Sequence, residues 1–200
     1  MKKKKSIWKK IGIIILSLIG LFFLISFTLR AIEKYNRGYD GQEVTSDQAL
    51  KVGRMSYTVN EIEVTDKIII DNVPRGTSDA DGTQYIFAII HLTLENNHLF
   101  RDYPLPPPNN MFTLMTESDN HRFGVSDEAS ELLAKELRVT KIQETNLGKR
   151  TDFDSVLAIP ILEEALEEQM YLNVSFPIGR KGKISLDIGP EDFVLYEPEE

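Results

Sequence analysis

The stretch QYIFAIIHLTLENN, residues 84–97, constrains the fold of this chain more than any other part of the sequence. With a period of two, one face is wholly aliphatic and consists of Ile86, Ala88, Ile90, Leu92 and Leu94. The opposite face is mixed, since it alternates aromatic, aliphatic and polar side chains. This pattern predicts a strand in the middle of a sheet, with one face in the core and the other face partly covered. Asn96 and Asn97 end the strand, because Asn tolerates turn conformations.

Shorter segments repeat the alternation along the rest of the chain. In MSYTVNEIEV the apolar positions slip by one residue at Glu61, which predicts a β-bulge or a bend. Further strands are expected at 67–71, 111–115, 121–125, 153–159, 170–176, 183–188 and 193–196. Many short strands without long helices between them predict an all-β fold, built as an antiparallel β-sandwich or barrel.

One short helix is expected within this series, at residues 126–137. Ser126 can cap its N-terminus, and Asp127 and Glu128 place negative charge in its first turn. A second helical turn is expected in PILEEALEEQ, with Pro160 at its first position.

The N-terminus carries a 19-residue run without a charge, from Ile11 to Leu29. As a helix it would be about 28 Å long, close to the roughly 30 Å hydrocarbon core of a bilayer. Six lysines precede it, so residues 1–10 are expected in the cytoplasm and the rest of the chain outside. The alternative is a cleaved signal peptide. The exit from Ser26 to Ala31 has bulky residues between its small ones, which favours an uncleaved anchor in the cell membrane.

Composition restricts the functions that the remaining chain can perform. Seven of the 23 basic residues lie at or before Arg30, whereas all 31 acidic residues lie at Glu33 or later. Residues 31–200 therefore carry 16 basic and 31 acidic groups, a net charge of −15. Such a domain repels nucleic acid, so no nucleic-acid partner is expected. The absence of cysteine excludes disulfides and thiolate metal sites. Residues 30–50 are polar and predict a flexible linker to a β domain at 51–200.

The chain resembles the bacterial DUF4352 family of extracytoplasmic immunoglobulin-like domains. The resemblance rests on KVGRMSYTVNEIEVTD, on YIFAIIHLTLENN with its terminal Asn pair, and on NLGKRTDFDSVLAIP, with Leu147, Gly148 and Pro160 in the family order. The family's proline before this glycine is missing, and Lys149 replaces the usual acid. The resemblance covers residues 51–176 and implies an immunoglobulin-like antiparallel β-sandwich. It implies no catalytic residues.

Catalytic and metal motifs are sparse. His91, His98 and His121 are the only histidines, and none has the spacing of a zinc motif, so a structural or surface role is expected for each. No nucleophile or nucleotide-binding motif occurs, and we expect neither enzyme activity nor a cofactor. The best metal candidate is calcium in SDADGT, with Asp79 and Asp81 as ligands. An ordinary Asp-Gly turn explains the same residues.

The proline-rich segment RDYPLPPPNN, residues 101–110, is the candidate partner-binding loop. Its prolines favour an extended conformation that another protein can recognise, with Tyr103, Leu105 and Pro107 as contact residues. The alternative is a rigid crossover between two sheets. Two functions therefore remain open. One is a membrane-tethered module that binds another envelope or secreted protein. The other is an accessory domain that binds calcium or a small ligand.

Overall fold

The structure is a computed structural model that describes residues 2–35, 41–70, 73–78, 84–142, 146–175 and 180–194. The chain divides into two compact units, Met1–Arg37 and Gly38–Glu200. We describe each unit by itself, and call the second one the body.

The first unit contains the single long helix α1 (Lys2–Tyr35). Its segment Ile14–Ala31 is long and apolar enough to cross a membrane. Both a membrane anchor and a signal sequence have these properties. The helix runs beyond the predicted end of the apolar run at residue 29. Residues 30–35 contain neither Gly nor Pro, so nothing in them stops the helix.

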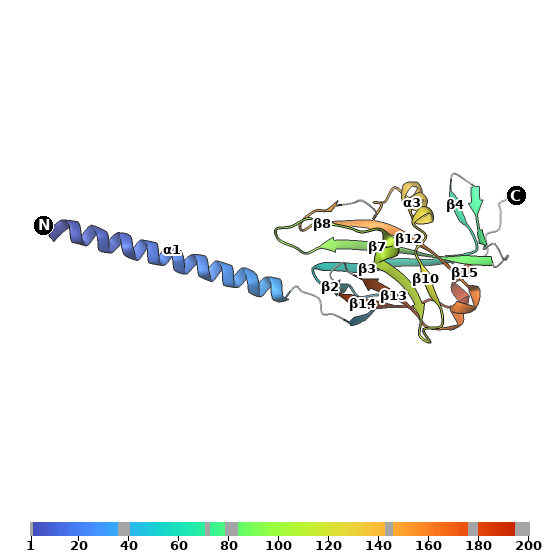
Figure 1. The fold of residues 1–200 in the computed structure, drawn as a ribbon. Helices are drawn as coiled ribbons and strands as arrows, with labels where there is room; N and C mark the ends of the chain where they lie inside the picture. Colours follow the sequence, from blue (N-terminus) through green and yellow to red (C-terminus); the bar gives the residue numbers. More distant parts are fainter. Residues whose placement is uncertain are drawn as a thin grey trace. The chain divides into compact units, whose positions relative to one another are not determined.

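The body is a mostly-β fold with two main sheets (Figure 1). One sheet has the order β12-β7-β3-β15, with β2 also paired to β3 and β6 to β7. Its strands are β2 (Leu50–Val52), β3 (Met55–Thr65), β6 (Thr77–Ser78), β7 (Gln84–Asn96), β12 (Asp152–Ile161) and β15 (Phe193–Val194). Strand β7 is antiparallel to both β3 and β12, as expected for the central strand.

The second main sheet has the order β1-β14-β13-β9-β10. Its strands are β1 (Gln42–Thr45), β9 (Phe112–Thr116), β10 (Arg122–Gly124), β13 (Met170–Ser175) and β14 (Lys181–Leu186). The described part of the body also contains two short two-stranded sheets. They pair β4 (Ile68–Ile70) with β5 (Val73–Arg75), and β8 (Tyr103–Pro104) with β11 (Asn146–Leu147).

The two faces of β7 lie in two different apolar clusters, as its sequence predicted. Ile86, Ala88, Ile90, Leu92 and Leu94 belong to the main core, which also contains residues of β9, β13 and β14 from the second sheet. Phe87 and Ile89 on the opposite face belong to a smaller outer cluster. This cluster also contains residues of β12, of β4 and of the helix α3 (Asp127–Glu136), which covers part of the sheet.

The phase slip in β3 is a β-bulge, as predicted. The register against β7 shifts between Val59, which pairs with Leu92, and Glu61, which pairs with His91. The extra residue is Asn60, whose side chain donates a hydrogen bond to the hydroxyl of Thr93 at 2.9 Å. The bulge therefore turns Glu61 and Glu63 to the outer face of the sheet, together with His91.

The predicted helix is confirmed, but the predicted second one differs. The hydroxyl of Ser126 accepts a hydrogen bond from the amide of Ala129 and caps α3. Pro160 does not begin a helix, because it lies within β12, where it pairs with Phe87. Strand β12 is an edge strand of its sheet, and an edge strand tolerates a residue without an N–H group. The later residues form the short 3₁₀ helix η1 (Glu163–Glu167). Two other short helices are α2 (Pro108–Met111) and η2 (Pro190–Asp192).

The predicted linker at 30–50 is wrong in its second half. Strand β1 pairs in parallel with β14, and β2 pairs with β3. Val44 and Leu50 are buried in the main core. The packing is close, because a Cβ on Gly182 of β14 would lie 2.8 Å from the Leu50 Cδ1 atom. The body therefore begins about ten residues earlier than the sequence predicted.

Candidate functional site

Asp79 and Asp81, the predicted calcium ligands, lie outside the described residues. Calcium binding by this loop therefore stays a prediction.

The predicted partner-binding residues 103, 105 and 107 lie mainly against the body. Leu105 is only 5% exposed and belongs to the main core, and half-buried Tyr103 packs against that core. Pro107 is half-buried and directly precedes α2. The side chain of Leu105 already fills the core, and contact of this segment with a partner stays a prediction. The rigid crossover, which was the alternative, agrees better with this packing.

A cavity of about 530 Å³ lies at the outer face of the first sheet, and we call it the β3/β4 cavity. Residues of β3, β4, β7, α3 and the C-terminal strand β15 line it. The apolar lining residues are Ile62, Val64, Ile68, Ile69, Ile89, Leu133, Leu137 and Val194. Its volume is within the range of about 300–1,000 Å³ that is usual for ligand sites.

Exposed apolar side chains are concentrated at this cavity. Among the described residues of the body, four large hydrophobic side chains are exposed: Ile69, Phe100, Leu137 and Val194. Three of them line the cavity, where Ile69, Leu137 and Val194 are 43%, 45% and 66% exposed. Scattered single apolar residues on a surface are ordinary, but several gathered around one concavity indicate a binding surface.

Ionisable groups lie at the same cavity. Glu63, Lys67, His91 and Asp192 contribute to its lining, together with the hydroxyl-bearing Thr65. The Nε2 atom of His91 lies 3.4 Å from Oε1 of Glu63. The carboxylate of Glu61, which is opposite His91 in the register, completes a group whose three ligand atoms all lie within 4.8 Å of one another.

Sequence reasoning missed this group because it considered motifs with short spacing. Glu61 and Glu63 are on β3, whereas His91 comes from the neighbouring strand β7. A signal was present, since Glu61-x-Glu63 follows the phase slip and places both acids on one face. The residue opposite them depended on the pairing of β3 with β7, which a local pattern does not specify.

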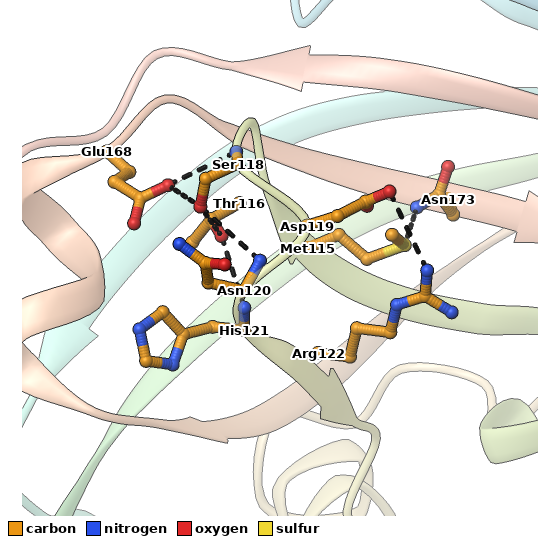
Figure 2. A network of polar contacts seen from close by, with 9 residues as sticks. All are labelled: Met115, Thr116, Ser118, Asp119, Asn120, His121, Arg122, Glu168 and Asn173. Atoms are coloured by element: carbon orange, nitrogen blue, oxygen red, sulfur yellow. Dashed lines mark hydrogen bonds and ion pairs between the residues drawn. The ribbon is translucent and has the colours of Figure 1, made fainter.

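A second polar region surrounds the turn between β9 and β10 (Figure 2). Both the hydroxyl and the amide of Ser118 donate to the carboxylate of Glu168, which directly follows η1. The hydroxyl hydrogen bond lowers the pKa of Glu168 below its ordinary value. Asp119, with a φ of 57°, pairs with Arg122 at 3.7 Å. These contacts hold the turn in place, and they are consistent with a structural role.

The outer face of the second sheet contains a further charged pair. The Nζ atom of Lys183 lies 2.9 Å from Oε2 of Glu43, its register partner on β1. The same ammonium lies 4.4 Å from the ring centroid of Tyr171. The hydrogen bond with Glu43 raises the pKa of Lys183. These contacts join β1 to β14, and Tyr171 and Lys183 also line a smaller cavity of about 260 Å³.

Comparisons with known proteins give structural likeness only. No protein-family model and no curated protein sequence matches the chain. One similar solved structure is an uncharacterised β-sandwich protein from Clostridium difficile 630. It is 12% identical with a TM-score of 0.45, and the match covers 74% of this chain and 96% of that chain. Another is a candidate lipoprotein from Staphylococcus aureus subsp. aureus NCTC 8325. It is 9% identical with a TM-score of 0.47, and the match covers 80% of this chain and 100% of that chain. Both TM-scores lie below 0.5, so neither likeness supports a function for this chain.

Proposed function

We propose that this protein is a membrane-anchored, extracytoplasmic module without catalytic activity, and that its body binds a partner protein at the β3/β4 cavity. The observation that carries the binding proposal is the gathering of Ile69, Leu137 and Val194 around one concavity. The anchoring proposal is supported by the apolar segment of α1, with six lysines before it and an acidic body after it.

We further propose that the body has an immunoglobulin-like topology and belongs with the DUF4352-type domains. The order β3-β7-β12 corresponds to strands A, B and E of an immunoglobulin fold, and β14-β13-β9-β10 corresponds to G, F, C and C′. The Asn pair at the end of β7 agrees with the family pattern.

The partner that fits best is a protein segment with apolar side chains and net positive charge. The apolar lining would accept the hydrophobic side chains of such a segment. The net charge of −15 on residues 31–200 would attract a cationic partner and repel an anionic one. This charge preference also agrees with the expected absence of nucleic acid from the site.

Site-specific photo-crosslinking in intact cells tests the binding proposal. A photoreactive residue at position 137 should capture a partner whose crosslinked peptide is basic and apolar. The same residue at position 117, which is exposed on the turn between β9 and β10, should not capture it. A Leu137→Asp and Val194→Asp double variant should bind the captured partner more weakly, because it removes apolar surface and adds repelling charge. Equal capture from positions 117 and 137, or capture of an acidic peptide, would contradict the proposal.

The location can be tested by cysteine labelling, because the chain contains no native cysteine. A membrane-impermeant maleimide should label Asn120→Cys in intact cells, and should label Lys5→Cys only after lysis. If the label on Lys5→Cys is found on a full-length chain in the membrane fraction, the anchor is uncleaved. A cleaved signal peptide would separate this label from the body. Labelling of position 5 but not of position 120 in intact cells would reverse the proposed orientation.

A second candidate function is binding of a small molecule or calcium, and the cavity volume favours the small-molecule form. The calcium form predicts a rise in melting temperature with Ca²⁺ that Asp79→Ala and Asp81→Ala abolish. If Ca²⁺ does not raise the melting temperature, calcium is removed from consideration and the partner-binding proposal is unaffected.

A further inference from the structure

Glu61, Glu63 and His91 form a group of potential metal ligands on the outer face of the first sheet. Each residue offers one ligand atom, and the three atoms lie within 4.8 Å of one another. An imidazole nitrogen with two carboxylate oxygens is a donor set suited to zinc and related divalent transition metals. The group therefore differs in chemistry from a cluster of acids alone.

The separation of the two best-placed ligand atoms fits a metal ion between them. His91 Nε2 and Glu63 Oε1 are 3.4 Å apart, which exceeds the roughly 2.7–2.9 Å of a charge-assisted hydrogen bond. Two atoms that are each about 2.0–2.2 Å from a tetrahedral ion lie roughly 3.4 Å apart. The carboxylate of Glu61 is exposed, so its side chain can rotate to complete the ligand set.

The backbone of β3 and β7 fixes which side chains meet here. The register pairs Glu61 directly with His91 after the bulge, and β3 places Glu63 on the same face two residues later. Without the bulge, the alternation that buries Val59 would turn Glu61 and Glu63 toward the core. The irregularity in β3 thus produces the cluster, and bulges are frequent beside functional sites.

Electrostatics also favours a cation at this position. Glu61 and Glu63 bring two acids to one face of one strand, and residues 31–200 carry a net charge of −15. A divalent ion would neutralise both carboxylates and relieve their mutual repulsion. Calcium fits less well, because it takes six to eight oxygen ligands and has little preference for imidazole.

We propose that Glu61, Glu63 and His91 bind one divalent transition-metal ion, with Zn²⁺ as the preferred ion. Three protein ligands leave a fourth coordination position open. Glu63 and His91 also line the β3/β4 cavity, so this open position would be available to a donor group of a molecule bound there. Metal binding does not depend on the proposed partner and can be measured without it.

Titration of the untagged full chain in detergent micelles tests the inference. After treatment with EDTA and removal of the chelator, calorimetry with ZnCl₂ should show one ion bound per chain. Co²⁺ should produce the visible absorption bands of a tetrahedral site with a nitrogen ligand. Glu61→Gln, Glu63→Gln and His91→Ala should each weaken Zn²⁺ binding by about tenfold or more, because each removes one ligand.

Matched variants separate this site from adventitious binding. Glu95→Gln changes another exposed acid on β7, and His121→Ala changes a histidine beside the second sheet. Both should bind Zn²⁺ as the unaltered chain does. The glutamine variants preserve side-chain shape, and their melting temperatures without metal should be close to that of the unaltered chain. The inference is overturned if Zn²⁺ does not bind, or if the control variants weaken binding as much as the three ligand variants.

Discussion

The side-chain nitrogen of Asn96 lies 3.0 Å from the carbonyl oxygen of Leu147, a residue 51 positions later in the chain. The same nitrogen lies 3.0 Å from the carbonyl oxygens of Arg101 and Gly148, so its two N–H groups are shared among three acceptors. The amide oxygen of Asn96 accepts from the backbone N–H of His98 at 2.9 Å. This side chain is fully buried, so it joins the end of β7, the following loop and β11 in one network.

We expect Asn96→Ala to lower the free energy of unfolding by about 3 kcal/mol, because it leaves several buried backbone groups without their partner. Urea unfolding of the full chain in detergent micelles measures this change. Asn120 is exposed, and Asn120→Ala should change the stability by less than about 0.5 kcal/mol. Equal effects of the two substitutions would mean that the Asn96 network contributes little.

The sequence could predict that the Asn pair ends a strand, but it could not predict which groups the side chain of Asn96 binds. The sequence indicated the end of a strand, which is correct. The carbonyl partners at residues 101, 147 and 148 come from distant segments, so only the tertiary structure identifies them. The faces of β7, the bulge at Glu61 and the cap at Ser126 were predictable because each depends on residues close in sequence.

The missed features depend on contacts between distant segments. Val44 is the only apolar residue in QEVT, and its burial requires β1 to pair with β14 across more than a hundred residues. The sequence of the proline-rich segment suggested Leu105 as a contact residue for a partner, whereas its side chain fills the core. The β3/β4 cavity depends on how α3 and β4 lie over the sheet. No local alternation of polar and apolar residues contains that information.

Close packing at Gly182 leads to the second prediction. An added Cβ would lie 2.8 Å from Leu50 Cδ1 and 3.1 Å from the carbonyl oxygen of Gln42. We expect Gly182→Ala to destabilise the body by about 1–3 kcal/mol, because β1, β2 and β14 must move apart. Gly124→Ala is the matched control, since a Cβ there has no neighbour within 4 Å. A thermal unfolding comparison in which both variants lose the same stability would contradict the close packing of β1 and β2.

The hydroxyl of Ser130 connects α3 to β12 and provides the third prediction. It accepts from the backbone N–H of Ala158 at 2.9 Å and donates to the carbonyl of Ser126 at 2.7 Å. Ser130→Ala would leave the buried N–H of Ala158 without this partner, at a cost of about 1–3 kcal/mol. Lys135→Ala, on the exposed side of the same helix, should cost less than about 0.5 kcal/mol. Hydrogen exchange at Ala158 should become faster only in the Ser130 variant. Unchanged exchange there would show that this hydroxyl does not protect the amide.

Tyr57 provides the fourth prediction, because its ring is completely buried and packs edge-on against Phe112 at 5.9 Å between ring centroids. Among the described residues, no hydrogen-bond partner lies within reach of its hydroxyl. Burial raises the pKa of this phenol well above its ordinary value of about 10. The folded state therefore retains the proton at a pH at which the unfolded state loses it. The stability that this difference contributes is fully present below about pH 10 and decreases as the pH rises above it.

We expect Tyr57→Phe to raise the free energy of unfolding at neutral pH by about 1 kcal/mol, because it removes an unpaired polar atom from the core. The variant should also lose less stability than the unaltered chain between about pH 10 and 11, since its buried ring cannot ionise. Urea unfolding at a series of pH values measures both effects. Tyr171→Phe alters a half-buried ring on the other sheet and should change the stability by less than about 0.5 kcal/mol at neutral pH. A loss of stability in Tyr57→Phe at neutral pH would indicate that the hydroxyl has a bonding partner after all, because only a satisfied hydroxyl contributes favourably in the core.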